Sequence, residues 1–391
     1  MLRSPIRFPF VAACCLLAGC STVRVGETLP APSDDIVGPS PPLEEAWSYD
    51  AEAAFGPMPV ILRGDVLLFG TRQGELQALR VGEDVRSMGR VELGEAIEGR
   101  LATDGRVAFV PVATGSKGVR AYDLRRGRTL WSGRYGPHLA GLVLDEEADV
   151  LVAASHDGVL RGLDPTTGDE RWAFTPDAVF GTTIGGRSYR SAPALMPGGR
   201  VAAVDDEGTV AAFDIDSGEM VWSLELNAPV LADLSSDAAG LLVSTTEGEV
   251  VAVGWEGAER WRYAAGPTVR MTTAASHEDL VVFGGTDGLL RALNSKAGAE
   301  RWAFRVDGAL AAPPAIGMVP GDAVPIVYVG GMDKRVLGIG ADSGEVVWQA
   351  EVDGRVKTAP VVVPGGVVFF REPSEVVMFR SSDNVADQTQ E

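Results

Sequence analysis

Cysteine and histidine are scarce in this chain of 391 residues. All three cysteines, Cys14, Cys15 and Cys20, lie near the N-terminus, so the remaining sequence has no thiol for a disulfide or a thiolate metal site. The three histidines stand alone, without the paired spacing of a metal-binding motif. The sequence also lacks a nucleophile elbow and a phosphate-binding loop. These absences predict a domain stabilised by core burial alone and argue against metal-dependent or hydrolytic chemistry.

Positive charge is also in deficit, because 34 lysines and arginines face 54 aspartates and glutamates, giving a formal net charge of −20 at pH 7. An acidic surface repels nucleic acids and anionic membrane headgroups, so the charge argues against both as partners. Solubility is the simplest reason for such a charge. Long hydrophobic runs are missing too: the apolar stretch from Phe8 to Leu17 is much shorter than the roughly 20 residues of a membrane span.

What the N-terminus does contain is an export signal. Arg3 and Arg7 form a basic region, the apolar stretch follows, and Leu17-Ala18-Gly19-Cys20 ends it. This ending resembles the lipobox of bacterial lipoproteins, which implies removal of residues 1–19 and lipidation of Cys20 with palmitate among the acyl groups. The alternative is an ordinary signal peptide with a cysteine there by chance. Ser21, where Asp would retain the protein elsewhere, resembles the sorting signal for the outer membrane of a Gram-negative cell, facing the periplasm.

Composition divides the mature chain into three parts. Residues 20–42 are rich in proline and poor in large apolar side chains, so we expect a flexible tether there, on the order of 25 Å in coil dimension. Residues 43–380 carry internal repeats and are expected to form one domain. Residues 381–391 are polar and are expected to form a disordered tail.

Tryptophan marks the repeat, at Trp131, Trp172, Trp222, Trp261, Trp302 and Trp348. Before most of them a small residue, an Asp or Asn, and a Gly recur at nearly constant spacing, as in Ala212-Phe213-Asp214 and Ser217-Gly218 before Trp222. Runs such as Thr209 to Asp214 alternate with the period of a strand, and Asp and Gly suit the tight turn that follows. Units of about 40 residues with four short strands are typical of β-propeller blades.

The number of blades follows from the two ends of the repeat region. Trp47 lies in a strand without a hairpin strand before it, while residues 358–363, 367–370 and 375–380 form three strands without a tryptophan strand after them. The orphan strand would complete the last blade and close the ring without an open sheet edge. Upstream, Gly74 to Leu79 leads to Met88 in place of tryptophan. The sequence therefore predicts an all-β, eight-bladed propeller of four-stranded antiparallel blades; seven blades is the alternative if the Met88 unit does not fold.

The unit A-x-D-x-x-T/S-G-x-x-x-W resembles the tryptophan-docking repeat of pyrroloquinoline-quinone (PQQ)-type propellers, from Trp47 to Arg380. One family with this repeat comprises the quinoprotein dehydrogenases, which bind PQQ and calcium. Resemblance to the alcohol dehydrogenases among them implies a vicinal cysteine pair, but Cys14-Cys15 lies in the signal peptide. The stretch from Asp214 to Gly218 is faintly similar to a calcium loop, yet it is one copy of the turn that recurs in the blades. We therefore expect no cofactor, no metal site and no catalytic residue.

The other family is BamB, the lipoprotein of the outer-membrane β-barrel assembly machine, which agrees in lipobox, proline-rich segment, eight units and length. The resemblance implies a non-enzymatic scaffold, monomeric within a complex, that docks on BamA and helps to deliver unfolded outer-membrane proteins. Partner contacts in that family cluster in a loop before a Ser-Ala-Pro strand start, which corresponds here to Pro176 to Arg190 before Ser191-Ala192-Pro193. The implied partner-binding residues are Phe180, Ile184, Arg187, Tyr189 and Arg190.

Two departures from the family leave the partner open. The family's leucine-arginine pair is not reproduced in this loop, and neutral residues near Asn227-Ala228-Pro229 replace its acidic pair on a neighbouring blade. A solvated insertion is the alternative interpretation of residues 176–190. For the whole chain, the alternative is a PQQ-repeat propeller lipoprotein that binds another envelope protein or a ligand.

Overall fold

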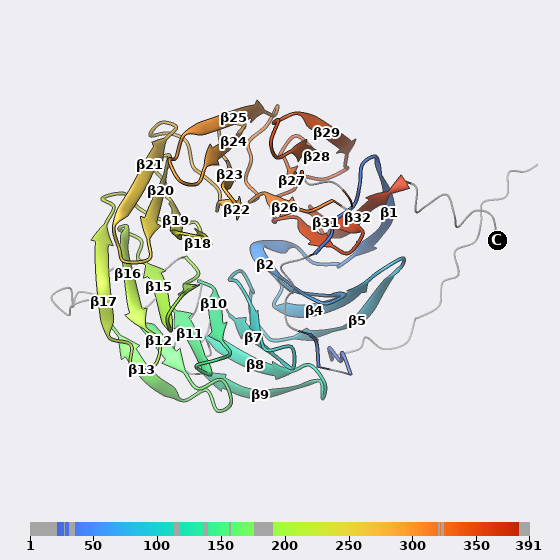
Figure 1. Cartoon of the computed structure of the whole chain (residues 1–391). Coiled ribbons are helices and arrows are strands. Elements are labelled where there is room, and N and C mark those ends of the chain that lie inside the picture. Colours follow the sequence, from blue (N-terminus) through green and yellow to red (C-terminus); the bar gives the residue numbers. More distant parts are fainter. Residues whose placement is uncertain are drawn as a thin grey trace, which may run out of the picture.

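The computed structural model describes residues 22–26, 28–30, 36–112, 118–133, 135, 140–155, 158–175, 191–319, 321 and 324–382, without the side chains of residues 57–62. The regular elements within these ranges are β-strands. They form eight four-stranded antiparallel sheets, which follow one another around a ring in Figure 1. The predicted eight-bladed β-propeller is confirmed, and the alternative of seven blades is wrong. No helix among the described residues is long and apolar enough to cross a membrane.

Seven blades take four consecutive strands each. They are β2 to β5 (Phe55–Arg63, Val66–Thr71, Glu75–Val81, Val85–Glu92), β6 to β9 (Ala102–Thr103, Val107–Pro111, Val119–Asp123, Arg128–Gly133), β10 to β13 (Leu142–Asp145, Val150–Ala154, Leu160–Leu163, Glu170–Phe174), β14 to β17 (Ala194–Met196, Arg200–Val204, Thr209–Asp214, Met220–Glu225), β18 to β21 (Ser235–Asp237, Gly240–Ser244, Glu249–Gly254, Glu259–Ala264), β22 to β25 (Ala275–His277, Leu280–Gly284, Leu289–Asn294, Glu300–Arg305) and β26 to β29 (Ala315–Gly317, Ile326–Gly330, Arg335–Gly340, Val346–Glu351). The eighth blade joins β1 (Leu43–Asp50) to β30, β31 and β32 (Val361–Val363, Gly366–Arg371, Glu375–Ser381).

The middle strands of a blade are buried on both sides because each side faces a neighbouring blade. In β15, Val201 and Ala203 pack in the cluster that includes β11, whereas Ala202 and Val204 pack in the cluster that includes β19. This is the period of two that a strand imposes on its side chains. The outer strand β17 instead alternates exposed and half-buried residues. The hydrophobic core is therefore a ring of inter-blade layers.

The turn before each outer strand is held by its own side chains. In the blade β14 to β17, the Asp214 carboxylate accepts the backbone N–H and the hydroxyl of Ser217, at 2.9 and 2.8 Å, and these hydrogen bonds hold the pKa of Asp214 below its ordinary value. Gly218 follows with a φ of +73°, a conformation that favours glycine. The calcium-like sequence thus forms a hydrogen-bonded turn, and its first carboxylate is already engaged.

Tryptophans of the outer strands link each blade to the next. The Trp172 indole N–H donates to the carbonyl of Ile215 in the following blade at 2.8 Å, and the ring lies against Gly218 of the same turn. Equivalent bonds of 2.6 to 3.0 Å run from Trp131, Trp222, Trp261, Trp302 and Trp348 to the carbonyls of Pro165, Trp255, Ser295, Ala341 and Leu43. Trp47 donates to the Gly82 carbonyl at a longer 3.4 Å.

The ring closes through its N-terminal strand, as predicted. β1 pairs antiparallel with β32, and Trp47 stands opposite Met378. Trp348 of the preceding blade donates to the carbonyl of Leu43 in β1 at 2.9 Å. Segments from the two ends of the chain therefore lie side by side in one sheet (Figure 1), so β32 has no open edge along its paired length.

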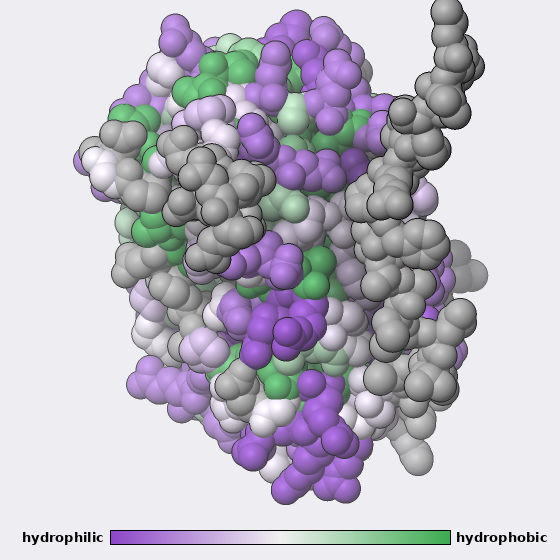
Figure 2. Space-filling view, turned by 90° about the vertical axis from the view of Figure 1, so that its right-hand side faces the viewer, coloured by the Kyte–Doolittle hydropathy of each residue, from purple (hydrophilic) through white to green (hydrophobic). Residues whose placement is uncertain are grey.

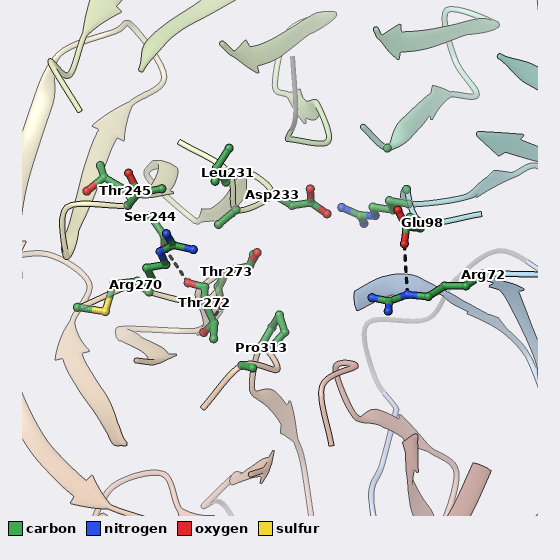
Figure 3. A pocket seen from close by; sticks show the side chains of 17 residues that line it. Arg72, Glu98, Leu231, Asp233, Ser244, Thr245, Arg270, Thr272, Thr273 and Pro313 are labelled. Carbon is green, nitrogen blue, oxygen red and sulfur yellow. Dashed lines mark hydrogen bonds and ion pairs between the residues drawn. The ribbon is translucent and has the colours of Figure 1, made fainter. Parts of the chain in front are cut away.

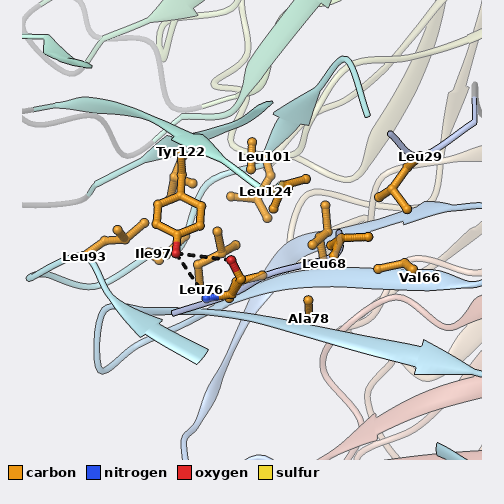
Figure 4. Close-up of a cluster of buried hydrophobic side chains, with 14 residues drawn as sticks. Leu29, Val66, Leu68, Leu76, Ala78, Leu93, Ile97, Leu101, Tyr122 and Leu124 are labelled. Carbon is orange, nitrogen blue, oxygen red and sulfur yellow. Dashed lines mark hydrogen bonds between the residues drawn. The ribbon is translucent and has the colours of Figure 1, made fainter. Parts of the chain in front are cut away.

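The segment before β1 is not a free coil over its described residues. Val23, Val25 and Leu29 are at most 7% exposed and belong to the core cluster that contains Tyr122 (Figure 4). Farther along, the Gly38 N–H donates to the Met318 carbonyl at 2.7 Å. The expectation of a flexible tether is wrong for these residues, because backbone hydrogen bonds and a few aliphatic side chains fasten the segment to the ring. We call the described residues between 22 and 42 the N-terminal strap.

The strap lies at the junction between β5 and β8, where the repeat has no tryptophan. Gly89 stands opposite Ala78, the position that tryptophan takes in the outer strands of the other blades. The expectation that Met88 replaces the tryptophan is therefore wrong by one residue. A Cβ at Gly89 would collide with the carbonyl of Thr22, so the absence of a side chain there leaves room for the strap.

Backbone groups of the strap reproduce the missing indole contacts. The Val25 N–H donates to the Leu124 carbonyl at 2.8 Å, and this carbonyl follows the turn-capping Asp123 as the Pro165 carbonyl follows Asp164. The Val23 carbonyl lies over Gly127, where a tryptophan ring covers the turn glycine of other blades. Tyr122 holds the same point: its hydroxyl accepts the Val23 N–H at 3.1 Å and donates to the Val23 carbonyl at 3.3 Å. The strap therefore joins these two blades as tryptophan joins the others.

Candidate partner-binding face

Strand direction alternates within each blade, so the connecting segments fall on two faces of the ring. One face carries the connections between blades and the turns between the second and third strands; we call it the mouth face. The opposite face carries the remaining turns and the N-terminal strap, which contacts Gly105, Leu124 and Met318 there. We call it the anchor face. Hydrophilic residues cover much of the rim between the two faces, with smaller hydrophobic areas between them (Figure 2).

The predicted partner-binding residues lie outside the described part of the chain. Phe180, Ile184, Arg187, Tyr189 and Arg190 all fall within residues 176–190, and they stay predictions. The two ends of this loop are described: it leaves the outer strand β13 and returns to the inner strand β14. Both ends belong to the mouth face. The predicted lipidation site Cys20 also lies outside, two residues before the first described residue.

The returning end of the loop is fastened to the neighbouring blade. The Ala192 N–H donates to the Asp233 carboxylate at 2.8 Å, and Ala192 itself is fully buried. Burial raises the pKa of the Asp233 carboxyl above its ordinary value, against the opposing effects of this hydrogen bond and of the Arg100 charge. A carboxylate at the base of the loop thus fixes where the loop ends.

Asp233 also lines a cavity of about 620 Å³ that opens among the mouth-face segments (Figure 3). Its other labelled lining residues come from inter-blade connections, turns and the end of β19: Arg72, Glu98, Leu231, Ser244, Thr245, Arg270, Thr272, Thr273 and Pro313. Arg72 and Glu98 form an ion pair with a Nε–Oε1 distance of 3.2 Å, and the Ser244 hydroxyl donates to the Thr272 carbonyl at 2.8 Å. The cavity and the base of the predicted loop are therefore parts of one surface.

The lining suits polar recognition by hydrogen bonds. The hydroxyl of Thr246 and the guanidinium groups of Arg72 and Arg270 provide hydrogen-bonding groups beside apolar side chains that include Met271 and Leu231. Such a mixed, partly charged concave surface fits an extended peptide or a polar ligand better than a wholly apolar one.

The same lining does not fit PQQ with its calcium ion. Calcium takes six to eight oxygen ligands, several of them carboxylates. Here Glu98 is engaged by Arg72 and Asp233 by the Ala192 N–H. Across the described ranges, no three His, Cys, Asp or Glu side chains are grouped to hold a metal ion. These residues therefore do not form the oxygen-rich calcium site that PQQ requires.

The sequence alone did not reveal Asp233 or the arginines of the mouth face. Asp233 follows Leu231-Ala232 in an inter-blade connection, and no motif distinguishes it from acidic turn residues elsewhere. Arg72, Arg100 and Arg270 lie far apart in sequence, and they line one cavity because their segments recur at one end of every blade. Equivalent positions in successive repeats lie at the same end of the blades. Alignment of the inter-blade connections, as well as of the tryptophans, could therefore have grouped these residues.

Tryptophan-linked, four-stranded blades in a closed ring define a PQQ-like repeat β-propeller. The family model described as outer membrane protein assembly factor BamB matches residues 43–183, 156–310 and 309–386. The chain therefore belongs to the BamB family, and the resemblance inferred from the repeat is confirmed.

Individual members of this family match the chain over part of their length. BamB of Yersinia pestis is 29% identical over 225 residues, which cover 50% of this chain and 56% of the relative. BamB of Bordetella pertussis is 30% identical over 183 residues, 46% of this chain and 45% of the relative. The chain thus spans about half the length of the curated relatives it matches.

Solved structures share the fold over longer spans. BamB from Moraxella catarrhalis has a TM-score of 0.66 at 18% identity, over 86% of this chain and 99% of that chain. The quinohemoprotein alcohol dehydrogenase ADHIIG from Pseudomonas putida HK5 has a TM-score of 0.71 at 14% identity, over 93% and 80%. At these identities the likeness shows the fold alone, which assembly factors and dehydrogenases have in common.

Proposed function

We propose that this protein is a BamB-like scaffold of the outer membrane, held by a lipid on Cys20 and facing the periplasm. It docks on a BamA-like assembly protein and assists the insertion of β-barrel proteins without enzymatic chemistry of its own. Membership of the BamB family over the whole propeller is the observation that carries this proposal. The relatives' names state assembly of outer-membrane proteins, which supports the same role here.

Docking is proposed at the mouth face through residues 176–190. This connection interrupts an acidic chain with Arg187 and Arg190 beside Phe180 and Tyr189, and aromatic and arginine side chains dominate binding energies at protein interfaces. The hydrogen bond from Ala192 to Asp233 supports the proposal, because a loop with a fixed base loses less entropy on binding. The neighbouring cavity would accept polar groups of the partner or of an unfolded client.

A pull-down of BamA from detergent-extracted envelopes tests the proposal. The variant Arg187→Glu with Tyr189→Ala should lose roughly 2–4 kcal/mol of binding, the range for two hot-spot residues, without a change in melting temperature. The matched control reverses one charge and truncates one large side chain away from the mouth face: Lys296→Glu with Met220→Ala, both of them exposed. The control should bind BamA as the natural chain does.

Other outcomes would contradict the proposed partner or the proposed docking site without affecting membership of the family. If the natural chain retains no BamA under conditions that preserve membrane complexes, the proposed partner is wrong. If BamA is retained equally by the loop variant and the control, docking lies outside residues 176–190.

A second candidate function is binding of another envelope protein or a polar ligand at the mouth face. The observation that favours it is the cavity of about 620 Å³ with its hydroxyl and arginine lining. The substitution Thr246→Val would remove one lining hydroxyl while keeping the side-chain shape. The second function replaces the first if two results are obtained. The natural chain must capture a partner other than BamA, and the amount captured must fall with this substitution.

A further inference from the structure

A cluster of arginines lies on the anchor face of this acidic protein. Arg106, Arg125 and Arg126 line a cavity of about 210 Å³ with Gly26 of the strap and Asp123. These three arginines are exposed, and within the described part of the chain Arg106 and Arg125 enter no ion pair. We call Arg24, Arg106, Arg125, Arg126 and Arg128 the arginine patch.

Two further arginines extend the patch along the strap and the edge of β9. The Arg24 guanidinium donates to the Arg126 carbonyl at 3.3 Å, and Arg128 stands opposite Asp123 in the β8–β9 pair. The carboxylate of Asp123 is engaged, because it accepts the backbone N–H groups of Arg125 and Arg126 at 2.9 and 2.8 Å. Asp104 is engaged in the same way by the N–H groups of Arg106 and Val107. Both carboxylates keep their charge, and Arg126 pairs with Asp123 at 3.8 Å, but five guanidinium groups against two carboxylates leave the arginine patch with a local excess of positive charge.

The strap places the membrane anchor beside this patch. Val23 is fixed by both hydrogen bonds of the Tyr122 hydroxyl, and Arg24 and Val25 are fixed to the Met88 and Leu124 carbonyls. Only Ser21 and Thr22 separate Val23 from Cys20, and the three extended residue steps between them span at most about 10 Å. An acyl group on Cys20 would thus enter the membrane next to the cavity lined by Arg125 and Arg126.

We infer that the arginine patch is a membrane-binding site for anionic phospholipid headgroups and holds the anchor face against the bilayer. The inference rests on the lipid anchor of the proposed function and adds the orientation of the ring. Guanidinium groups bind phosphate oxygens in bidentate geometry, and a basic cluster reinforces a lipid anchor at an anionic surface. The mouth face, at the other end of every blade, is then presented to the periplasm.

The net charge of −20 does not oppose this contact, contrary to the expectation from the whole sequence. Salt limits the reach of a charge to about 8 Å under physiological conditions. Headgroups that contact the arginine patch therefore experience these guanidinium groups more strongly than carboxylates on distant blades. The overall charge repels the rest of the ring from the membrane and so favours contact through this one surface.

A fluorescent label on the acylated full-length protein tests the orientation. Maturation of the lipoprotein leaves no free thiol, so Thr129→Cys gives a single label on β9 beside the patch, and Glu247→Cys gives one on the mouth face; both natural residues are exposed. The protein is inserted into vesicles of phosphatidylethanolamine with or without phosphatidylglycerol, which carry a headgroup-linked quencher. We expect strong quenching at position 129 and little at position 247. Quenching at 129 should weaken with added salt or without phosphatidylglycerol.

A matched pair of charge reversals then tests the arginines. Arg125 and Lys296 occupy the same place in equivalent turns, because their N–H groups donate to Asp123 and Asn294 respectively. Arg125→Glu should shift the ratio of bound to released orientation by at least roughly fivefold, the effect of one basic residue at an anionic surface. Lys296→Glu, on another blade, should leave that ratio unchanged.

Each other outcome contradicts a defined statement. Strong quenching that is insensitive to phosphatidylglycerol, salt and Arg125→Glu overturns headgroup binding, since the anchor alone would then hold the face. An unquenched label at position 129 on protein that floats with the vesicles overturns the orientation as well. Protein that does not float at all, and fractionates like Cys20→Ala, contradicts the lipid anchor of the proposed function and overturns this inference with it.

Discussion

A single indole joins most pairs of neighbouring blades, and its ring packs against a glycine of the next blade. Gly218 illustrates why: its φ of +73° closes the turn, and a Cβ added there would lie 2.5 Å from the Trp172 ring. Gly257 and Gly298 receive Trp222 and Trp261 in the same way. The recurring glycine of the sequence pattern therefore combines two requirements, a left-handed backbone and close contact with the ring of the preceding blade.

A comparison of two alanine substitutions separates these requirements. Gly218 and Gly198 both have positive φ, but a Cβ at Gly198 would meet nothing within 4 Å. Gly198→Ala should cost about 1–2 kcal/mol of unfolding free energy, the penalty of the left-handed conformation. Gly218→Ala should cost about 1–3 kcal/mol more, because the methyl group overpacks a buried junction. Denaturant titration of the two variants measures the difference in unfolding free energy. Equal losses of unfolding free energy would mean that the Trp172 ring moves aside without cost.

At the scale of elements, β1 carries the closure of the ring. Its backbone pairs with β32 from Leu43 to Asp50, and its Leu43 carbonyl accepts the Trp348 indole. Its own tryptophan contributes less than the others, because Trp47 is half-buried and its N–H lies 3.4 Å from the Gly82 carbonyl. The strand matters here mainly through its backbone and through the edge that it covers.

Removal of the strand should therefore be far worse than removal of its tryptophan. Deletion of residues 43–53 exposes the edge of β32 and leaves the Trp348 N–H without its acceptor, so we expect aggregation. Trp47→Ala should cost less than the roughly 3–5 kcal/mol typical of a fully buried tryptophan and should leave a monomer. Size-exclusion chromatography and thermal melting distinguish the two. A deletion variant that stays monomeric with unchanged melting would refute closure by β1.

The repeat elements were predictable from sequence, and the strap was not. Strand period, turn residues and tryptophan spacing report local requirements that recur in the blades, so Trp222 and Gly218 identify their blade wherever it lies. The strap depends on backbone groups: the Val25 N–H meets the Leu124 carbonyl regardless of its side chain. Composition also misjudged it, because Val23 and Val25 bury completely or nearly so within a segment that is otherwise poor in large apolar residues. Spacing likewise missed Gly89, since Gly89 lies 11 positions after its partner Ala78, whereas Trp222 lies 10 positions after its partner Ala212.

At the scale of the molecule, the proposed anchoring and the proposed recognition fall on opposite faces of the ring. The strap and the arginine patch lie on the anchor face, whereas Asp233, the cavity and both ends of residues 176–190 lie on the mouth face. Blades contact mainly their neighbours, so the ring would act as a rigid spacer between these two proposed functions. Fold and class could be predicted from the repeat; the division into faces required the positions of connections that carry no shared motif.

This division predicts that the loop can be exchanged without cost to the ring. Residues 175–193 join β13 to β14, about twice the length of residues 226–234, which join β17 to β18. Replacing residues 176–190 by a glycine-serine segment that restores the shorter length should leave the melting temperature within a few degrees, because changes in loop length alter closure entropy only slightly. The same protein should lose BamA in the pull-down while still floating with membranes. The matched control inserts the same segment at Gly321, in an anchor-face turn where an added Cβ would meet no atom within 4 Å. This control protein should retain BamA. If the loop replacement melts much earlier than the control, residues 176–190 are part of the ring's stability, and loss of BamA could not then be assigned to docking.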